Sequence, residues 1–403
     1  MSTSLLYHAC ALRGYHCVST AYQGNDVVFN IEGFPNKRRC SACGSKEVIG
    51  RGQEERQFRN VPFGGKGTVL RLGIQRLECK TCTAVRQAEL GFADPRRTYT
   101  RAFERCALGL LKHMTIKAVA RYLKVSWDVI KDIQKRCLQK RYRHIKLKHL
   151  RRIGIDEISI GHGHKYLTIV LDIDSGEVVF VGDGKGSDAL QPFWKRLRAS
   201  RAKVEAVAMD MSEAYIGAVR KNLPKAAIVF DHFHVIKLYN DKLGALRRQL
   251  QNKAEVEGKR VLKGTRWLLL KNPENLKEER DERQRLDAAL SLNQPLATAY
   301  YMKEDLRQLW SQHSKFRAVL FLDDWLLRAR ASGVDMLDRF AATLDAHRAG
   351  VLAYYDHPIS NGPLEGTNNK IKTMQRQAYG FRDLEFYKLR ILALHESRYE
   401  LIG

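Results

Sequence analysis

The spacing of apolar residues changes near residue 152, and the change shows where the chain should form strands. Alternating, β-branched runs predict three strands, over 153–160, 165–173 and 177–183. Helix-like segments and short apolar runs then alternate, and two of these runs end at Asp210 and Asp231. A meander of strands followed by alternating helices and strands predicts an α/β fold on a mixed sheet.

Acidic residues occur in this pattern at positions that a half-buried sheet disfavours. Asp156 lies in the middle of the first predicted strand. Asp210 follows the carboxyl end of another, where open α/β sheets place their sites. Taken alone, Asp156 fits either a surface acid on an alternating strand or a metal ligand. Glu157 points to the opposite strand face, so we assign it no catalytic role.

A strongly polar helix near the end of the chain supplies a third acid, Glu365. Pro363 lies near the predicted helix start, and only a few apolar residues could anchor the helix in a core. Neighbouring turns of one face carry amides and cations beside the acid, namely Asn368, Asn369, Lys372 and Arg376. Such a face suits a helix that meets a metal site and a phosphate backbone.

Residues 114–142 have the pattern of a helix-turn-helix. Thr115 and Ser126 can each cap a short helix, and Lys124 and Val125 form the turn between the two helices. The residues expected to face inward are Ala118, Val119 and Leu123, then Val129, Ile130 and Ile133. The outward residues of the second helix, which would enter the major groove of DNA, are Trp127, Asp128, Lys131, Gln134 and Lys135. An ordinary helical hairpin is the alternative.

Basic residues outnumber acidic ones by 70 to 44, which gives a formal net charge of +26. Residues 1–150 hold most of the excess, with 29 basic and 11 acidic residues. This asymmetry favours a polyanionic partner, most often nucleic acid, over a solvated basic surface. We expect DNA contacts from Ser126, Trp127, Lys131, Lys135, Lys140, Arg141 and Arg143, and from Lys370, Lys372 and Arg376.

Two C-x2-C pairs indicate a structural zinc site, with ligands Cys40, Cys43, Cys79 and Cys82. Gly44 allows a tight turn after the first pair, whereas Thr83 takes that place after the second. The segment between the pairs is glycine-rich and β-like, which is typical of a ribbon hairpin. The other four cysteines lack a partner pattern, so we expect buried thiols at Cys10, Cys17, Cys106 and Cys137.

The composition is that of a globular protein with several domains. The chain has 403 residues, of which 44% are hydrophobic and 28% charged. It has no run of about 18 apolar residues, and the first residues lack the pattern of a secretion signal. We therefore expect a cytoplasmic protein, associated with the nucleoid.

These motifs, in this order, resemble bacterial insertion-sequence transposases of the IS-L-three family. The resemblance rests on the cysteine pairs, the helix-turn-helix and the segments "GIDEISI", "AVAMDMSEAY", "DHFHVIKLYND" and "SNGPLEGTNNKIKTMQRQAYGFR", and it covers nearly the whole chain. It implies an RNase H-like DDE domain in which Asp156, Asp210 and Glu365 are the catalytic carboxylates. Asp231 and His234 resemble a motif found near the active site in several DDE families.

The resemblance also implies an order of domains. A zinc-binding module would occupy 1–92 and a helix-turn-helix domain with a basic tail 93–150. The RNase H-like domain would be split into 151–239 and 356–403. The separation of 155 positions between Asp210 and Glu365 is more than its compact core needs, so 240–355 would be a mainly helical insertion, with breaks at Pro273 and Pro295.

The function implied is DNA transposition. Three carboxylates can bind two Mg²⁺ or Mn²⁺ ions for cleavage and strand transfer, at the terminal inverted repeats of the element and at target DNA. Two ends must be joined, so we expect a homodimer or a larger assembly. Two other functions stay open: a non-catalytic DNA-binding regulator and an RNase H-like nuclease without strand transfer.

Overall fold

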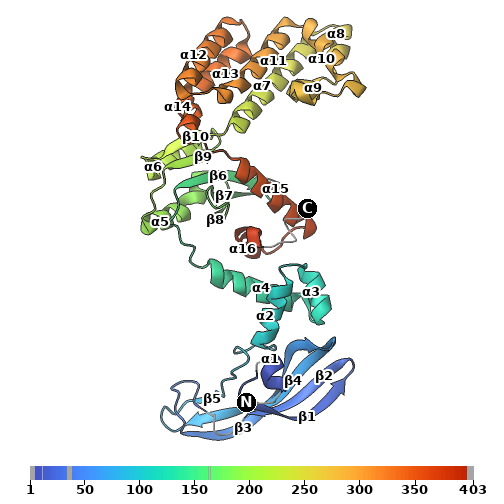
Figure 1. Cartoon of the computed structure of the whole chain (residues 1–403), viewed down its shortest axis with the longest axis vertical. Helices are drawn as coiled ribbons and strands as arrows, with labels where there is room; N and C mark the ends of the chain where they lie inside the picture. The colour runs from blue at the N-terminus through green and yellow to red at the C-terminus, as the bar shows by residue number, and fades with distance from the viewer. Residues whose placement is uncertain (1–4, 11, 34–38, 162, 164, 397–403) are drawn as a thin grey trace. The chain divides into compact units, whose positions relative to one another are not determined.

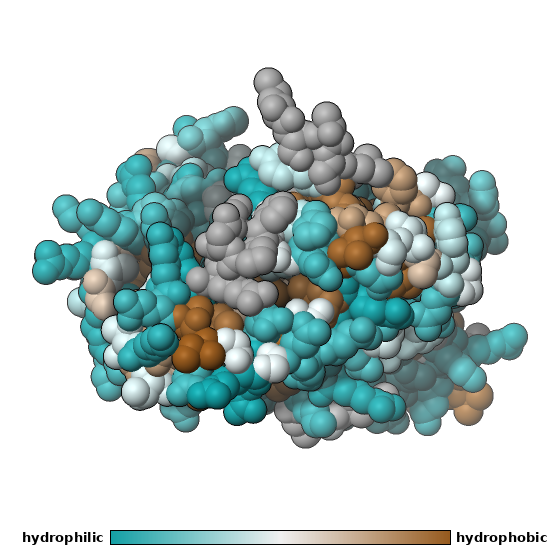
Figure 2. Space-filling view, turned by 90° about the horizontal axis from the view of Figure 1, so that it is seen from below, coloured by the Kyte–Doolittle hydropathy of each residue, from teal (hydrophilic) through white to brown (hydrophobic). Residues whose placement is uncertain are grey.

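The structure is a computed structural model that describes residues 5–10, 12–33, 39–161, 163 and 165–396. The chain divides into two compact units, Met1–Arg143 with His395–Gly403, and His144–Leu394 (Figure 1). The face seen in Figure 2 is mainly hydrophilic, with small separate hydrophobic patches. None of the helices in the described ranges combines the length and the apolar character that crossing a membrane requires.

The first unit contains a five-stranded sheet of order β1-β2-β4-β3, in which β5 also pairs with β4. β3 and β4 form the predicted ribbon hairpin, which turns at Gly64 and Gly65 with φ of 56° and 75°. A two-residue turn of this kind needs positive φ at both positions, which glycine adopts without strain. The elements are α1 (Leu5–Cys10), β1 (Tyr15–Gln23), β2 (Asp26–Gly33), β3 (Val48–Phe63), β4 (Lys66–Cys79) and β5 (Val85–Gln87).

The four cysteines outside the C-x2-C pairs are not all buried. Cys10 is buried in the core beside the sheet, and Cys106 and Cys137 are partly buried. The prediction was wrong for Cys17, which is exposed because β1 faces solvent along nearly its whole length.

Three helices complete the described part of the first unit: α2 (Arg101–Leu110), α3 (Ile116–Leu123) and α4 (Trp127–Tyr142). The predicted caps are confirmed, since Thr115 Oγ1 accepts the Ala118 N–H and Ser126 Oγ accepts the Val129 N–H. Lys124 makes the turn in the left-handed region, with φ of 53°.

The burial of α3 and α4 differs from the prediction at several places. Val129, predicted to face inward, and Lys131 and Lys135, predicted to face outward, are each partly buried. Ala120 is buried in α3, whereas the predicted Ala118 is only partly buried. Gln134 was expected to face outward, but it lies in the buried face of α4. Its position follows from helix geometry, because Gln134 is one turn from buried Ile130 and one turn before buried Leu138.

The second unit contains a sheet of order β10-β9-β6-β7-β8. β6, β7 and β8 form an antiparallel meander, while β9 and β10 run parallel to β6. This is the strand order of an RNase H-like domain, so the predicted fold class is confirmed. The strands are β6 (Arg152–Ser159), β7 (Tyr166–Asp172), β8 (Val178–Asp183), β9 (Ala206–Met209) and β10 (Ala227–Phe230).

Helices cover both faces of this sheet. Val170 packs with Phe193 and Tyr215 on the side of α5 and α6, whereas its neighbour Ile169 packs with Leu364 and Ile371 on the side of α15. Successive side chains of a strand point to opposite faces, so β7 needs the apolar run that its sequence provides. The helices are α5 (Gln191–Ser200), α6 (Glu213–Asn222), α15 (Gly362–Gln377) and α16 (Leu384–Leu392), and η2 (Ser187–Leu190) is a 3₁₀ turn.

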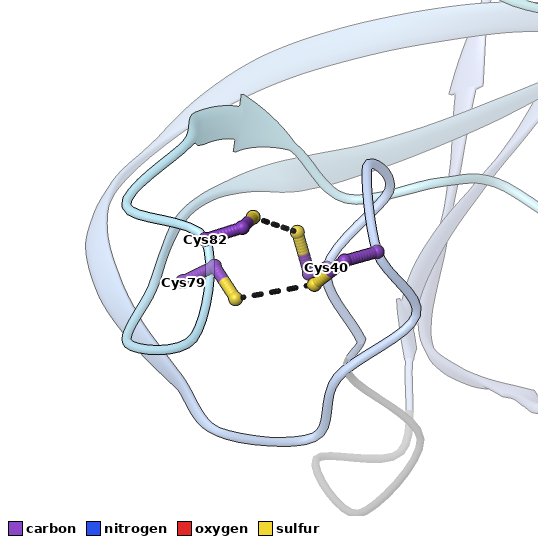
Figure 3. A group of neighbouring side chains, drawn as sticks. Cys40, Cys79 and Cys82 are labelled. Atoms are coloured by element: carbon purple, nitrogen blue, oxygen red, sulfur yellow. Dashed lines mark hydrogen bonds between the residues drawn. The ribbon is translucent and has the colours of Figure 1, made fainter.

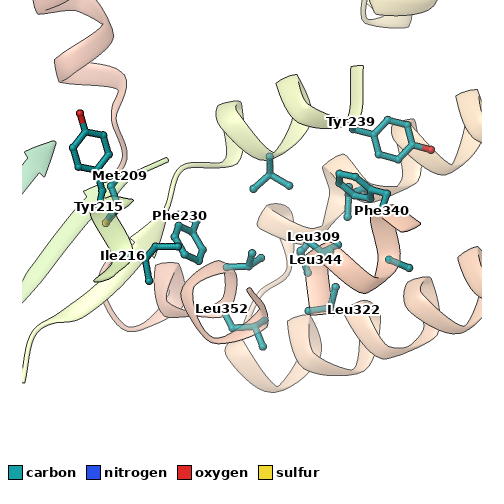
Figure 4. Close-up of a cluster of buried hydrophobic side chains, with 14 of the residues drawn as sticks. Met209, Tyr215, Ile216, Phe230, Tyr239, Leu309, Leu322, Phe340, Leu344 and Leu352 are labelled. Atoms are coloured by element: carbon teal, nitrogen blue, oxygen red, sulfur yellow. The ribbon is translucent and has the colours of Figure 1, made fainter. Parts of the chain in front are cut away.

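The segment between β10 and α15 is helical throughout its regular structure, as predicted for an insertion. Figure 4 shows its core continuing from Met209 and Phe230 at the sheet to Tyr239 and Phe340. The helices are α7 (His232–Lys253), α8 (Val256–Leu262), α9 (Arg266–Leu270), α10 (Glu282–Ser291), α11 (Gln294–Arg307), α12 (Lys315–Ala331), α13 (Asp335–Ala346) and α14 (Arg348–Leu352). The 3₁₀ turns are η3 (Pro273–Asn275), η4 (Glu278–Arg280), η5 (Gln308–Ser311) and η6 (Ala353–Tyr355).

Candidate active site

The pairing register of β6 and β9 brings two of the predicted acids to the same level of the sheet. Gly154 pairs with Ala208, 54 positions further along the chain. The same offset separates Asp156 from Asp210, the residue that directly follows β9. Because the strands are parallel, continuing the register places the two acids opposite each other on adjacent strands.

Asp156 is half-buried, and both its carboxylate oxygens accept hydrogen bonds. The Glu157 N–H donates to Oδ1 and the Asn368 Nδ2 to Oδ2, each at 2.8 Å. Burial is the largest cause that raises the pKa of Asp156 above its usual value, and the charge of Asp210 raises it further. The Glu157 N–H and the charge of His234 act in the opposite direction. The site therefore holds negative charge that a bound cation would stabilise.

The start of α15 is tied to the start of α7 through Asp231. This carboxylate is 4% exposed, caps α7 by accepting the Phe233 N–H at 2.7 Å, and accepts the Asn361 N–H. Gly154 lets α15 approach β6, because a Cβ at this position would lie 2.6 Å from Leu364 Cδ1. These contacts position the helix that carries Glu365 and Asn368 over the strand that carries Asp156.

Glu365 lies in the first turn of α15 and is exposed. It precedes Asn368 by one turn, so the two share a side of the helix. Among the described residues, no three acids or histidines bring their ligand atoms within 4.8 Å of one another. The structure thus brings Asp156 and Asp210 to neighbouring strands, and the carboxylates of Asp156, Asp210 and Glu365 do not form such a group.

The donor atoms of the three acids nevertheless suit a hard divalent cation. Mg²⁺ binds carboxylate oxygens and keeps several water ligands, so it does not need all its ligands from the protein. The residues that would hold it are Asp156, Asp210 and Glu365.

The four paired cysteines converge at one end of the β3–β4 hairpin (Figure 3). Their sulfur atoms all lie within 4.8 Å of one another, with Sγ–Sγ distances of 3.7 Å for Cys40 and Cys82 and 3.5 Å for Cys43 and Cys79. Tetrahedral zinc with Zn–S bonds of about 2.3 Å requires sulfurs about 3.8 Å apart. The cluster therefore fits a structural zinc ion.

Both cysteine turns have the same backbone form. The Gly44 N–H donates to Cys40 O and the Thr83 N–H to Cys79 O, each at 2.9 Å. Gly44 has φ of 78°, and Thr83 reaches the same left-handed region with φ of 56°. The backbone N–H of Cys82 is the largest cause that lowers the pKa of Cys79, to about 6, which favours the thiolate that zinc needs.

Comparisons with known proteins show the family to which the chain belongs. The family model for the DDE domain of ISL3 elements, described as "Transposase", matches residues 153–391. The chain belongs to the ISL3 (IS-L-three) family of transposases. Two further models match the same transposase, the helix-turn-helix domain of transposase family ISL3 at 88–138 and the zinc-finger of transposase IS204/IS1001/IS1096/IS1165 at 36–82.

Two curated relatives of this ISL3 transposase are transposases of other insertion sequence elements. It is 31% identical to the transposase for insertion sequence element IS1001 of Bordetella parapertussis, over 88% of each chain. It is also 31% identical to the transposase for IS1557 of Mycobacterium tuberculosis, over 91% of this chain and 88% of the relative. The Drosophila P element transposase strand transfer complex aligns with a TM-score of 0.35 and 12% identity, over 76% of this chain and 94% of that one.

The DNA-binding helix-turn-helix of the transposase exposes part of the expected surface. Ser126 and Trp127 are exposed, and Lys131 lies over the Trp127 ring at 5.4 Å. Lys131 and Lys135 are partly buried, whereas the side chains of Lys140, Arg141 and Arg143 are exposed. On α15, Lys372 and Arg376 are exposed and Lys370 is partly buried.

Some of the basic residues around α4 bind acids of the transposase itself. Arg136 forms ion pairs with Glu104 and Asp132, both at 3.2 Å. Arg151 pairs with Glu205 at 2.9 Å. Arg136 and Arg151 are therefore less available to DNA than basic residues without such ion pairs.

The structure adds residues to the candidate site that the sequence did not single out. Asn368 was placed on the polar face of its helix without a role, yet it donates directly to Asp156. Asn361 is 2% exposed, and neither polar atom of its side chain has a partner among the described residues. The burial of Asn361 and Asn368 is a property of the folded chain and is not visible in the sequence. Glu157 lies on the opposite face, where its carboxylate accepts the Tyr215 hydroxyl at 3.3 Å.

Proposed function

We propose that this ISL3 transposase is a DDE enzyme that cuts DNA at the ends of its insertion sequence and joins the ends to target DNA. The observation that carries the proposal is the β6–β9 register, which pairs Gly154 with Ala208 and, continued by two residues, would set Asp156 opposite Asp210. The bond from Asn368 to Asp156 supports it, because Asn368 lies one turn after Glu365. Asp156, Asp210 and Glu365 would hold Mg²⁺ or Mn²⁺.

The ions, when bound, would activate the attacking oxygen and neutralise charge on the leaving oxygen. The chain's own residues have positioning roles. Asn368 holds the Asp156 carboxylate in one orientation, and Asp231 fixes the start of α15. Phosphoryl transfer of this kind needs aligned groups and charge neutralisation and no protein nucleophile. Lys370, Lys372 and Arg376 on the same helix would bind the DNA backbone near the reacting phosphate.

The other modules would recognise the element and assemble its ends. Zinc would be held by Cys40, Cys43, Cys79 and Cys82 and would keep the N-terminal module folded. The helix-turn-helix would place Ser126, Trp127, Lys131 and Lys135 at a terminal repeat, with Lys140, Arg141 and Arg143 on phosphates. The segments 1–92, 93–150, 151–239 with 356–403, and 240–355 would be the domains. A homodimer or larger assembly would hold both ends.

An assay with the purified protein and DNA carrying the ends of its own insertion sequence tests the proposal. In Mg²⁺ or Mn²⁺ we expect cleavage at the ends followed by strand transfer into a second DNA, and little reaction in Ca²⁺, whose looser coordination misplaces the reacting oxygens. Cleavage without strand transfer would indicate a nuclease. Specific binding of the ends with no cleavage in any of the ions would indicate a regulator. Either result would overturn the proposal.

A further inference from the structure

A pocket of about 520 Å³ opens beside the first turns of α7. It is lined by residues of α7 and η5, by the last residues of α9 and α11, and by Asn272, all within the second unit. The volume lies in the range of pockets that bind small molecules, about 300–1,000 Å³. Its lining includes His232, Phe233, Asn240, Asn272, Gln308 and Trp310.

Aromatic rings form much of the lining. The rings of His232 and Trp310 lie 5.9 Å apart at 49° to each other. Phe233 is 48% exposed, which is high for a large apolar ring in a folded domain. Planar rings of this kind offer stacking surfaces to a flat aromatic ligand.

Amide groups supply the polar part of the lining. Asn240, Asn272 and Gln308 each carry both a donor and an acceptor, as the edge of a nucleobase does. Asn240 Oδ1 and Trp310 Nε1 are buried and have no hydrogen-bond partner among the described residues. Both atoms are closed off from solvent, so they belong to the wall behind the pocket and not to the surface that a ligand would touch.

The charge of the lining favours a neutral ligand over a phosphate. Arg307 is the one arginine among the described residues that line the pocket. Its guanidinium is engaged by two carboxylates, those of Glu274 and Glu304. A phosphate site would present an available cation or a set of backbone N–H groups. A base with its hydrogen-bonding edge fits this surface better.

The first turn of α7 joins the pocket to the candidate active site. His232 and Phe233 line the pocket, and they directly follow Asp231 in the chain. Asp231, between β10 and this turn, also holds the start of α15. We propose that the pocket receives one unstacked nucleobase of the DNA strand being cut, next to the reacting phosphate. The inference rests on the proposed function for the identity of the ligand.

Photo-cross-linking tests the proposal. The probe is DNA carrying the element's own end, with 5-iodouracil at successive positions near the cleavage site, bound to the wild-type protein without added Mg²⁺. We expect cross-links from one or two adjacent positions to residues 232–240 or 308–311. Phe233→Ala should lower both the cross-link yield and cleavage about tenfold, as loss of one base-stacking ring does. Phe316→Ala, an equally drastic change at a ring that is 70% exposed outside the pocket, should change neither.

A second readout separates base binding from a structural effect of the variant. An abasic nucleotide at the cross-linking position removes the base, so cleavage of that DNA should be the same for wild type and Phe233→Ala. Cross-links confined to other segments, or a Phe233→Ala variant that cuts like wild type, would overturn the proposal. If adding excess free nucleoside monophosphate abolished the cross-link, the pocket would be assigned to a free nucleotide. That result would also overturn the proposal.

Cleavage by the wild type, measured with Mg²⁺ on the same DNA, distinguishes a failure of the pocket assignment from a failure of the proposed function. A wild type that cuts, with no cross-link in the pocket, overturns the pocket assignment alone. A wild type that never cuts overturns the proposed function, while the cross-link still decides whether a base occupies the pocket.

Discussion

Asn368 and Asp156, 212 residues apart in the chain, are joined by a hydrogen bond of 2.8 Å from the amide Nδ2 to the carboxylate Oδ2. We expect Asn368→Ala to lower cleavage about tenfold to a hundredfold, because hydrogen bonds to charged groups contribute about 1.5–3 kcal/mol. The variant should also need more Mg²⁺ for half-maximal cleavage, since the Asp156 carboxylate would be held less firmly. Binding of the element's end should stay within a few-fold of wild type.

Asn369→Ala is the matched control, because Asn369 is the next residue and its side chain is exposed. Equal losses for the two variants, or an Asn368→Ala variant with unchanged Mg²⁺ dependence, would argue against a positioning role for Asn368.

The raised pKa of Asp156 predicts that Asp156→Asn stabilises the metal-free protein. Burial raises this pKa in the folded state, so at pH values between the unfolded pKa, about 3.9, and the folded pKa the folded state binds more protons. The Asp156 carboxyl therefore lowers the free energy of unfolding more and more as pH rises through that window. The full decrease is reached above the folded pKa. At pH 7, without divalent ions, Asp156→Asn should melt at a higher temperature than wild type, and the difference should shrink towards pH 4.

The substitution need not break the local hydrogen bonds. Asn368 Oδ1 is buried and has no partner among the described residues, so a flipped Asn368 amide could accept from the new side chain. Millimolar Mg²⁺ should raise the melting temperature of wild type more than that of the variant. A variant that melts lower than wild type at pH 7 in the absence of metal would contradict the expected repulsion.

The cysteine cluster predicts about one zinc ion per chain. Cys79→Ser should lose it, and the N-terminal module should become sensitive to proteolysis, because zinc binding and folding are coupled in such sites. Elemental analysis and limited proteolysis measure the two effects. Cys17→Ser is the control, since Cys17 is exposed and lies outside the cluster. A wild type that folds without bound metal would refute the prediction.

The exposed basic residues at the end of α4 predict a salt-dependent part of DNA affinity. Reversing Lys140 and Arg143 to Glu should weaken binding and flatten the slope of log affinity against log salt by about one unit for each phosphate that the variant no longer binds. Reversing the exposed Arg283 and Arg339 of the insertion provides a control with the same change in net charge. An unchanged slope for the first pair would place the phosphate-binding residues elsewhere.

The regular elements followed from the sequence because their causes are local. The alternating run around Asp156 favours the strand β6, and the glycine pair favours the β3–β4 turn. Thr115 and Ser126 cap the first turns of α3 and α4. Each depends on neighbouring residues only, through the pleat, the turn or the cap. The candidate acids Asp156 and Asp210 were found for the same reason, by their place within or after a strand.

The contacts that organise the candidate site depend on segments far apart in the chain, and local patterns do not contain them. The bond between Asp231 and Asn361 spans 130 residues, and that between Asp156 and Asn368 spans 212. The burial of Gln134 likewise depends on which side of α4 packs against the other helices. The pocket beside α7 exists only when α7, η5 and the chain after α9 come together.

The catalytic assignment is tested most directly by cleavage of the element's own ends with Asp156→Asn, Asp210→Asn, Glu365→Gln and, as the control, Asp231→Asn. The first three should abolish cleavage and strand transfer in Mg²⁺ and keep DNA binding within a few-fold of wild type. Asp231→Asn should be impaired less, because an asparagine still caps α7 and loses only one of the two bonds that Asp231 accepts. If Asp231→Asn were inactive and Asp210→Asn active, the second catalytic carboxylate would be Asp231, which follows β10, and not Asp210. Cleavage by all four variants would contradict the catalytic assignment.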